Sequence, residues 1–135
     1  MKIINSLFIL FFLSCSQALS AEISPQKIDG ATTIDATKAK QLFDQGALFV
    51  DVRRDSDWDS DRIPDALHLE LKKVFSIETL LEEAKKDEPI IIYCNGEKCL
   101  RSSKATVLAV EWGFKNIYFF RDGFPAWKMA SFPVE

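Results

Sequence analysis

The stretch PIIIYCNGEKCLRSSKATVLAVEWG, residues 89–113, decides the fold of this chain. Its first six residues are a run rich in β-branched apolar side chains, as in a strand that is buried on both faces. Apolar residues then recur at helical spacing over residues 102–112, and Gly113 supplies a helix stop. The sequence therefore predicts a strand, a polar loop with two cysteines and a helix, one after the other.

Outward from this unit, strands and helices alternate along the rest of the chain. Apolar runs predict strands at residues 31–35, 47–52, 67–71, 89–94 and 115–120. Helical spacing, with Asp35 or Thr37 and Ser76 as N-caps, predicts helices near residues 37–44, 76–86, 102–112 and 124–130. The acidic residues 53–66 predict a turn region. This alternation is typical of an α/β sandwich, with a mostly parallel five-stranded sheet and helices on both faces.

Residues 1–20 have the layout of a secretory signal peptide, with a basic start at Lys2, an apolar core and small residues before Ser20. The apolar core is short for a membrane span. We therefore expect an exported protein, most simply a periplasmic one, with no stable membrane span after cleavage. An alternative interpretation makes Cys15 the lipid-bearing residue of a lipoprotein.

The rest of the chain has the length of one domain, which we place at residues 30–135. Loss of the leader would remove Lys2 and no acidic residue, so the net charge would change from −3 to −4. A mildly acidic domain lacks the basic surface of nucleic-acid-binding proteins. We therefore expect no nucleic-acid partner.

The loop after residues 89–94 is the candidate reactive site. Ligands of parallel sheets bind beyond the carboxyl ends of the strands, where Cys94 lies. A cysteine attacks as its thiolate, which needs positive surroundings. The following helix start and Arg101 could provide them, and Asn95-Gly96 permits a positive φ that lets backbone N–H groups converge. The residues expected to bind an anion here are Asn95, Gly96, Glu97, Lys98, Leu100 and Ser102.

Two longer stretches resemble the rhodanese family. LFVDVRRDSDWDSDRIPDALHLEL, residues 48–71, is similar to its Asp-Val-Arg strand end, acidic aromatic-bearing turn and Ile-Pro-x-Ala element. IIYCNGEKCLRSSKATVLAVEWGFKNIYFFRDGFPAWKMASFPVE, residues 91–135, resembles the half that contains the strand-end cysteine and Arg-Ser. The resemblance covers roughly residues 30–135 and implies a rhodanese-like three-layer sandwich.

The resemblance also implies a chemistry, that of an exported single-domain sulfurtransferase. Cys94 matches the cysteine that takes the outer sulfur of an anionic donor such as thiosulfate as a persulfide. That sulfur would pass to cyanide or a thiol, including a possible protein acceptor, while Arg101 and the loop N–H groups stabilise the anions. The implied cycle needs no metal and no organic cofactor.

The loop departs from the family pattern in its length and in Cys99. Four residues usually separate the cysteine from the loop arginine, whereas six do so here. Cys99 could be the nucleophile itself, could resolve a persulfide, or could form a disulfide with Cys94. Two other functions therefore stay open: a catalytically silent binding module, and a redox protein that cycles a Cys94–Cys99 disulfide.

Two charged groups outside the loop have simpler interpretations. Asp51 and Arg53 end a predicted strand, and we expect them to support the loop structurally as an ion pair. The alternating acids of residues 55–61 do not match a calcium loop, because Ser60 and Ala66 stand where Gly and Glu are needed. A solvated acidic turn and no metal site are expected.

Overall fold

The computed structural model describes residues 22–135, so the predicted leader and Cys15 lie outside the described residues. A single sheet of five strands forms its centre, in the order β1-β5-β4-β2-β3, and every pair of neighbours is parallel. The strands are β1 (Ala31–Thr33), β2 (Leu48–Asp51), β3 (Leu67–His68), β4 (Ile90–Tyr93) and β5 (Ile117–Phe120). The expected five-stranded sheet is confirmed, and it is fully parallel.

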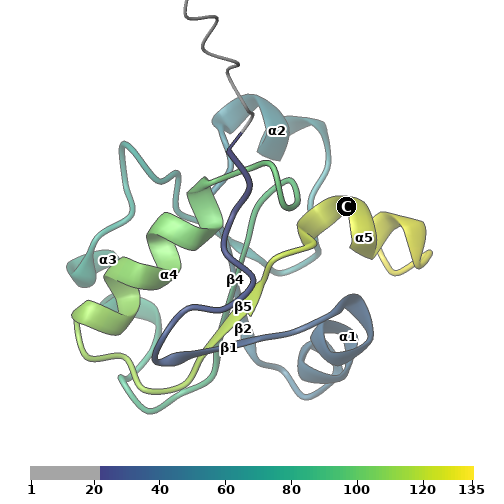
Figure 1. Cartoon of the computed structure of the whole chain (residues 1–135). Coiled ribbons are helices and arrows are strands. Elements are labelled where there is room, and N and C mark those ends of the chain that lie inside the picture. The colour runs from purple at the N-terminus through teal and green to yellow at the C-terminus, as the bar shows by residue number, and fades with distance from the viewer. Residues whose placement is uncertain (1–21) are drawn as a thin grey trace, which may run out of the picture.

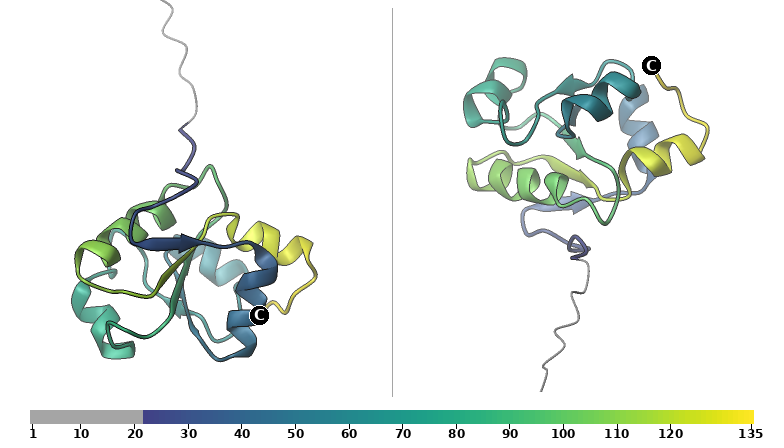
Figure 2. Two further views of the ribbon diagram at one scale, coloured as in Figure 1. Left: turned by 60° about the horizontal axis from the view of Figure 1, so that its bottom comes forward. Right: turned by 90° about the horizontal axis from the view of Figure 1, so that it is seen from above.

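Helices cover both faces of this sheet, as Figure 1 shows with the strands between them. The helices are α1 (Ala36–Asp44), α2 (Asp55–Ser60), α3 (Ile77–Glu83), α4 (Arg101–Glu111) and α5 (Gly123–Met129). Helices α3 and α4 lie on one side, α1 and α5 on the other, and α2 lies beyond the strand ends (Figures 1 and 2). The predicted three-layer α/β sandwich is therefore confirmed.

The central strand β4 shows why this sequence folds in this way. All four of its residues are completely buried. Ile90 and Ile92 belong to the core beneath α3 and α4, while Ile91 and Tyr93 belong to the core beneath α1 and α5. Successive side chains of a strand point to opposite faces, so a continuous apolar run fills both cores.

Two helix starts follow the predicted capping chemistry. The Asp35 side chain accepts a hydrogen bond from the backbone N–H of Lys38 at 2.8 Å, which caps α1. Ser76 forms a capping box with Thr79 at the start of α3. Each cap satisfies backbone N–H groups that have no partner inside the helix. Helix α3 ends at Glu83, earlier than the expected residue 86.

The prediction of a turn across residues 53–66 is wrong for residues 55–60, which form α2. The sequence of α2, DSDWDS, has one apolar residue and therefore lacks the apolar spacing that indicates a helix. In agreement, no residue of α2 is buried. Tertiary contacts stabilise it instead: Trp58 stacks on His68 with ring centroids 4.7 Å apart, and Arg62 lies over Trp58. The negative charges of Asp55 and Asp57 in its first turn also interact favourably with the helix dipole and stabilise the helix.

Strand β3 is shorter than the predicted residues 67–71 and ends at His68. The chain turns at Glu70, whose carbonyl oxygen accepts hydrogen bonds from Val74 at 3.0 Å and Phe75 at 3.1 Å. This turn buries the Glu70 side chain at the carboxyl edge of the sheet. Among residues 22–135, no helix is both long and apolar enough to cross a bilayer.

Candidate active site

The loop of residues 94–100 joins β4 to α4 at the carboxyl edge of the sheet. Gly96 has a φ of 103°, the positive value that its sequence predicted. Gly123, at the start of α5, has a φ of 62° and lies so close that a Cβ there would overlap the carbonyl oxygen of Cys94. The N–H of Phe124 donates to that same oxygen at 2.9 Å. The start of α5 thus fixes the backbone of the loop.

A second support comes from the beginning of the described chain and could not be predicted from the sequence. The N–H of Ser24 donates to the carbonyl oxygen of Glu97 at 2.8 Å. Arg121 donates to the Ser24 carbonyl at 2.9 Å and pairs with the Glu97 carboxylate at 3.4 Å. Residues from two distant parts of the chain, Ser24 and Arg121, therefore hold the middle of the loop.

Cys94 lies at the bottom of the loop and is completely buried. Its thiol is within hydrogen-bonding distance of the Ser102 hydroxyl at 3.1 Å and the Cys99 carbonyl at 3.4 Å. The backbone N–H of Ser102, in the first turn of α4, donates to the sulfur at 3.3 Å. Burial, and next the neighbouring Cys99 side chain, raise the pKa of Cys94. Cys94 is therefore a protonated thiol at neutral pH.

Cys99 lies above Cys94, is only partly buried, and carries a free thiol like Cys94. The adjacent Cys94 side chain is the main reason why the pKa of Cys99 is lowered to about 6, against the opposing effect of burial. The backbone N–H groups of Asn95 and Arg101 add to this lowering. Cys99 faces a pocket of about 360 Å³ lined by Arg54, Asp57, Asn95, Lys98, Cys99 and Arg101.

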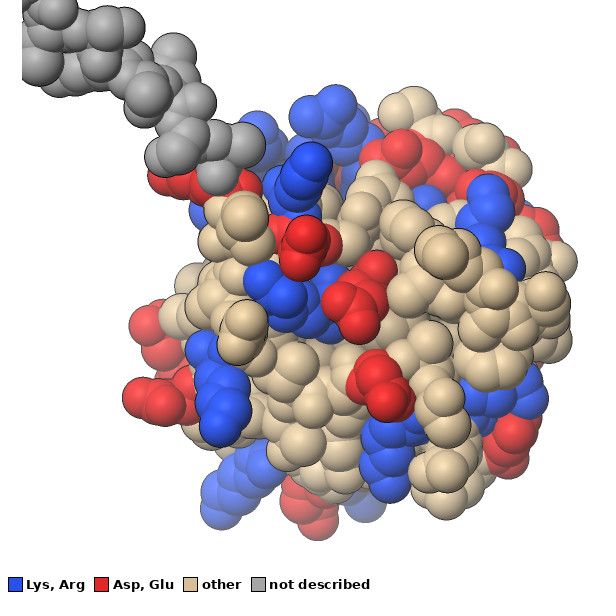
Figure 3. Space-filling model, turned by 45° about the vertical axis from the view of Figure 1, so that its right-hand side comes forward, with Lys and Arg blue, Asp and Glu red and all other residues tan. Residues whose placement is uncertain are grey.

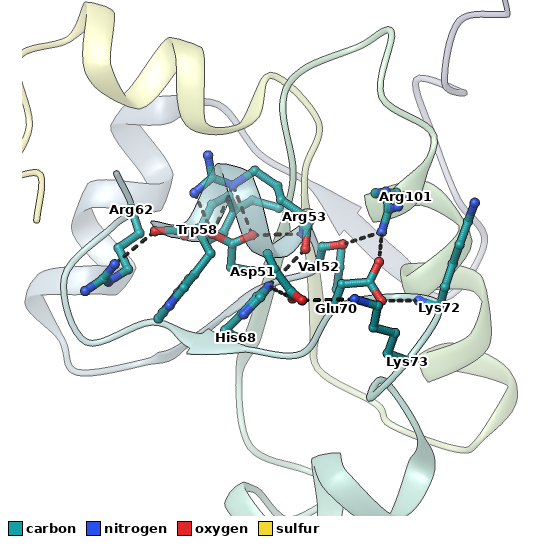
Figure 4. A network of polar contacts seen from close by, with 12 residues as sticks. Asp51, Val52, Arg53, Trp58, Arg62, His68, Glu70, Lys72, Lys73 and Arg101 are labelled. Carbon is teal, nitrogen blue, oxygen red and sulfur yellow. Dashed lines mark hydrogen bonds and ion pairs between the residues drawn. The ribbon is translucent and has the colours of Figure 1, made fainter. Parts of the chain in front are cut away.

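Arg101 lines this pocket, but it is not the free cation that the sequence led us to expect. Its guanidinium is paired with the carboxylate of Glu70 and also donates to the Val52 carbonyl at 3.4 Å (Figure 4). Burial acts to raise the pKa of Glu70, but the hydrogen bond and charge of Arg101 outweigh it and lower that pKa. Glu70 is thus a carboxylate that neutralises Arg101.

Arg54 and Lys98 are the cations of the pocket that are not held in an ion pair within the described chain, and they outnumber its one acidic residue, Asp57. Both side chains are exposed, and neither forms a hydrogen bond or an ion pair with any residue in the described range 22–135. Arg54 was not among the residues predicted from the sequence, because only the fold brings the end of β2 next to the cysteine loop. On the face drawn in Figure 3, acidic and basic side chains are mixed rather than separated.

Asp51 and Arg53 form a buried ion pair beneath the loop, with a 2.8 Å separation between Arg53 Nη2 and Asp51 Oδ2. The Tyr93 hydroxyl donates to the same carboxylate at 2.8 Å. Arg53 also donates to the Asn95 side-chain oxygen at 3.3 Å, and its guanidinium lies 4.4 Å from the Phe124 ring centroid. The pair therefore reaches the loop through Asn95.

The remaining predicted loop residues have different surroundings. Glu97 and Lys98 are exposed, whereas Ser102 is buried against the Cys94 thiol. Leu100 is half-buried and precedes the first residue of α4. A larger hollow of about 580 Å³ lies elsewhere, near Gly46 and Pro89, and no thiol lines it. The loop is therefore the part of the described chain that combines thiols, helix N–H groups and free cations.

Comparison with known proteins decides the family. The family model for the rhodanese-like domain matches residues 35–130. The chain belongs to the rhodanese-like domain family.

The relatives of this rhodanese-like domain agree with that assignment. It is 34% identical over 103 residues to the thiosulfate sulfurtransferase GlpE of Pseudomonas syringae, a match covering 76% of this chain and 91% of that protein. The enzyme of the same name from Haemophilus influenzae is 29% identical over 102 residues, covering 76% and 92%. The solution structure of a rhodanese-like domain from Anabaena matches with a TM-score of 0.65 and 24% identity, covering 76% of this chain and 77% of that one. The rhodanese-like fold is confirmed.

Proposed function

We propose that this rhodanese-like domain moves a sulfane sulfur from an anionic donor of the thiosulfate type to a nucleophilic acceptor, through a persulfide on Cys94. The family match and the similarity to thiosulfate sulfurtransferases confirm the predicted enzyme class, which is sulfurtransferase. One observation carries the finer proposal: the Cys94 sulfur accepts the N–H of Ser102 at the start of α4, directly below a cationic pocket.

The N–H of Ser102 and the start of α4 favour a negatively charged sulfur at Cys94. Unpaired N–H groups at a helix N-terminus stabilise anions. A persulfide anion is such a group, and the Cys94 Sγ that would bear its outer sulfur lies 3.3 Å from the Ser102 backbone nitrogen and 3.1 Å from the Ser102 hydroxyl. This arrangement supports a persulfide that survives between the two halves of the reaction.

The pocket supports an anionic donor. Arg54 and Lys98 offer two cationic groups to a small dianion beside the thiols, and Asp57 is an acidic group of the pocket wall. Attack on the outer sulfur of thiosulfate breaks its S–S bond and releases sulfite with the electron pair. The positive charges favour both the entering dianion and the leaving sulfite.

A second hollow adjoins the thiol pocket. That hollow, of about 460 Å³, shares Asp57 and Asn95 with the thiol pocket and carries Met129, which is 87% exposed. The two adjoining hollows leave room beside the thiols for a protein thiol acceptor as well as for a small thiol or cyanide. We therefore include a protein acceptor in the proposal.

Turnover tests this function directly. The purified, reduced protein is mixed with thiosulfate and cyanide, and thiocyanate is measured over time. We expect many turnovers per molecule and none in the Cys94→Ser/Cys99→Ser double variant. Binding of thiosulfate without thiocyanate would instead support a silent binding module, and a cycling Cys94–Cys99 disulfide without sulfur uptake would support a redox protein.

We further propose that the chain acts after export, most simply in the periplasm, on the ground of the predicted leader at residues 1–20. Fractionation of producing cells, with the intact mass of the recovered protein, checks this. A cleaved chain in the periplasm is expected. A cytosolic chain that retains Met1 would contradict it, and a lipid on Cys15 would identify the lipoprotein alternative.

A further inference from the structure

The two thiols of the loop differ in access. Cys94 has no exposed surface, and Cys99 is among the residues that line the cationic pocket. The carbonyl oxygen of Cys99 lies 3.4 Å from the Cys94 sulfur, so the Cys99 backbone lies directly against the buried thiol. A donor bound between Arg54 and Lys98 therefore meets the sulfur of Cys99, not that of Cys94.

We propose that Cys99 is the entry residue, which takes the sulfane sulfur from the donor and passes it to Cys94 for storage. This inference rests on the proposed function and adds a second catalytic cysteine with a defined order. It reverses the simplest sequence-based expectation, in which Cys94 attacks the donor itself. The low pKa of Cys99, about 6, agrees with this order, because the accessible sulfur is then the thiolate at neutral pH.

The first step is an attack by the Cys99 thiolate on the outer sulfur of the donor. For thiosulfate, a new S–S bond forms to Cys99, the donor S–S bond breaks, and sulfite leaves with the bonding electron pair. The product is Cys99–S–S⁻. Two negative charges leave as sulfite, and one remains on the outer sulfur in the pocket that Arg54 and Lys98 line.

The second step moves the sulfur inward. The Cys94 sulfur attacks the outer sulfur of Cys99–S–S⁻, and the S–S bond to Cys99 breaks with its electron pair. The proton of the Cys94 thiol passes to the departing sulfur of Cys99, the residue whose carbonyl oxygen lies 3.4 Å from the Cys94 sulfur. The products are Cys94–S–S⁻ and Cys99–SH, so atoms, charge and electrons balance without an added oxidant or reductant.

Storage at Cys94 follows from the surroundings of the two sulfurs. The buried Cys94 sulfur accepts a hydrogen bond from the Ser102 N–H at 3.3 Å, whereas Cys99 lines the pocket and is accessible from solvent. A persulfide on Cys94 is therefore shielded from soluble reductants. The reverse transfer to Cys99 would present the sulfur to an acceptor at the pocket mouth.

The position of Lys98 makes the order in which the two cysteines take up sulfur measurable. Lys98 lies between the two cysteines, so cleavage by trypsin after Lys98 places Cys94 and Cys99 on different peptides. Reduced protein is mixed with thiosulfate and quenched with iodoacetamide at increasing times. It is then digested with trypsin, and the masses of the two cysteine peptides are measured by mass spectrometry. We expect the extra sulfur first on the Cys99 peptide and later on the Cys94 peptide.

Two variants test the relay. Cys94→Ser is expected to load Cys99 more slowly at neutral pH, because the pKa of Cys99 rises without the Cys94 side chain, and to approach the rate of the unmodified protein above about pH 8.5. It should lose the sulfur soon after the donor is removed. Cys99→Ser is expected to load Cys94 at least about tenfold more slowly. Circular dichroism spectra and melting curves that match the unmodified protein show that both variants fold, and Cys99→Ala repeats the test without a hydroxyl.

The outcomes separate this inference from the proposed function. If Cys99→Ser and Cys99→Ala load Cys94 as fast as the unmodified protein, or if Cys94→Ser takes up no sulfur, the relay is overturned while the sulfurtransferase stands. A Cys94–Cys99 disulfide with released hydrosulfide would also overturn the relay. If the unmodified protein takes up no sulfur on either peptide, the proposed function itself fails.

Discussion

The guanidinium of Arg101 is bound to the carboxylate of Glu70, 31 residues earlier in the chain, at the wall of the thiol pocket (Figure 4). The two side chains are 15% and 5% exposed, so solvent screens their interaction only weakly. Because of this pair, Arg101 is not a free cation of the donor site. The donor anion depends on Arg54 and Lys98 instead.

Glu70→Gln should release the charge of Arg101 into the pocket. A unit charge about 4 Å from an anion in water contributes roughly 1 kcal/mol, so we expect the KM for thiosulfate to fall about fivefold. Steady-state thiocyanate assays measure it. An unchanged KM in a folded variant would show that Arg101 stays outside the donor site even without its partner.

Arg54→Gln should have the opposite effect. Loss of one free cation from the pocket is expected to raise the KM for thiosulfate about fivefold, and to make kcat/KM less sensitive to salt. Lys115→Gln is the matched control, because Lys115 is an exposed cation that precedes β5 at the far edge of the sheet. Equal effects of the two variants would mean that net charge alone, and not the pocket, attracts the donor.

The thiolate of Cys99 should be measurable by alkylation. With a pKa of about 6, the rate of its reaction with iodoacetamide should rise as pH passes upward through 6 and level off above it. In Cys94→Ala the midpoint should move up toward the ordinary cysteine value of about 8.5, because Cys94 is the largest cause of the lowered pKa. A midpoint near 8.5 in the unmodified protein would contradict the assigned ionisation.

Gly123→Ala should displace the cysteine loop. The added methyl group would overlap the Cys94 carbonyl oxygen, and φ is 62° there, so we expect about 2–4 kcal/mol of lost stability and a large loss of kcat. Gly46→Ala is the control, because φ is 81° but no atom lies within 4 Å of the new methyl group. It should cost about 1–2 kcal/mol and leave turnover intact. Denaturant unfolding and thiocyanate assays compare the two.

Asp51→Ala should be strongly destabilising. It would leave Arg53, which is 2% exposed, without its carboxylate partner and deprive the Tyr93 hydroxyl of its acceptor. Breaking a buried ion pair in this way costs about 3–5 kcal/mol. Urea unfolding checks the value. A cost below about 1 kcal/mol would mean that water replaces the carboxylate without penalty.

The sheet and its reactive edge could be predicted because each depends on local patterns. A continuous apolar run such as residues 90–93 identifies a central strand, and a strand-loop-helix order places Cys94 at the carboxyl edge. Helix α2 could not be predicted, since none of its residues is buried and its acidic sequence has no apolar spacing. Its stability comes from the stacking of Trp58 on His68, a contact between separate parts of the chain.

The same distinction applies to the site. The residues of the cysteine loop are adjacent in sequence and could be named from it, whereas their partners are not. Glu70 neutralises Arg101 across 31 residues, and Arg121 reaches Ser24 across 97. Neither pairing has a sequence motif, because charged side chains of this kind are common on any surface. Only the packed fold shows which cations remain free.

The central claim is that Cys94 stores a sulfane sulfur. The most direct measurement is the mass of the tryptic peptide that ends at Lys98, after the reduced protein has been exposed to thiosulfate and freed of it by rapid desalting. The account predicts one additional sulfur on this peptide, released as thiocyanate when cyanide is added. An unmodified peptide, from protein shown to be folded and fully reduced, would contradict it.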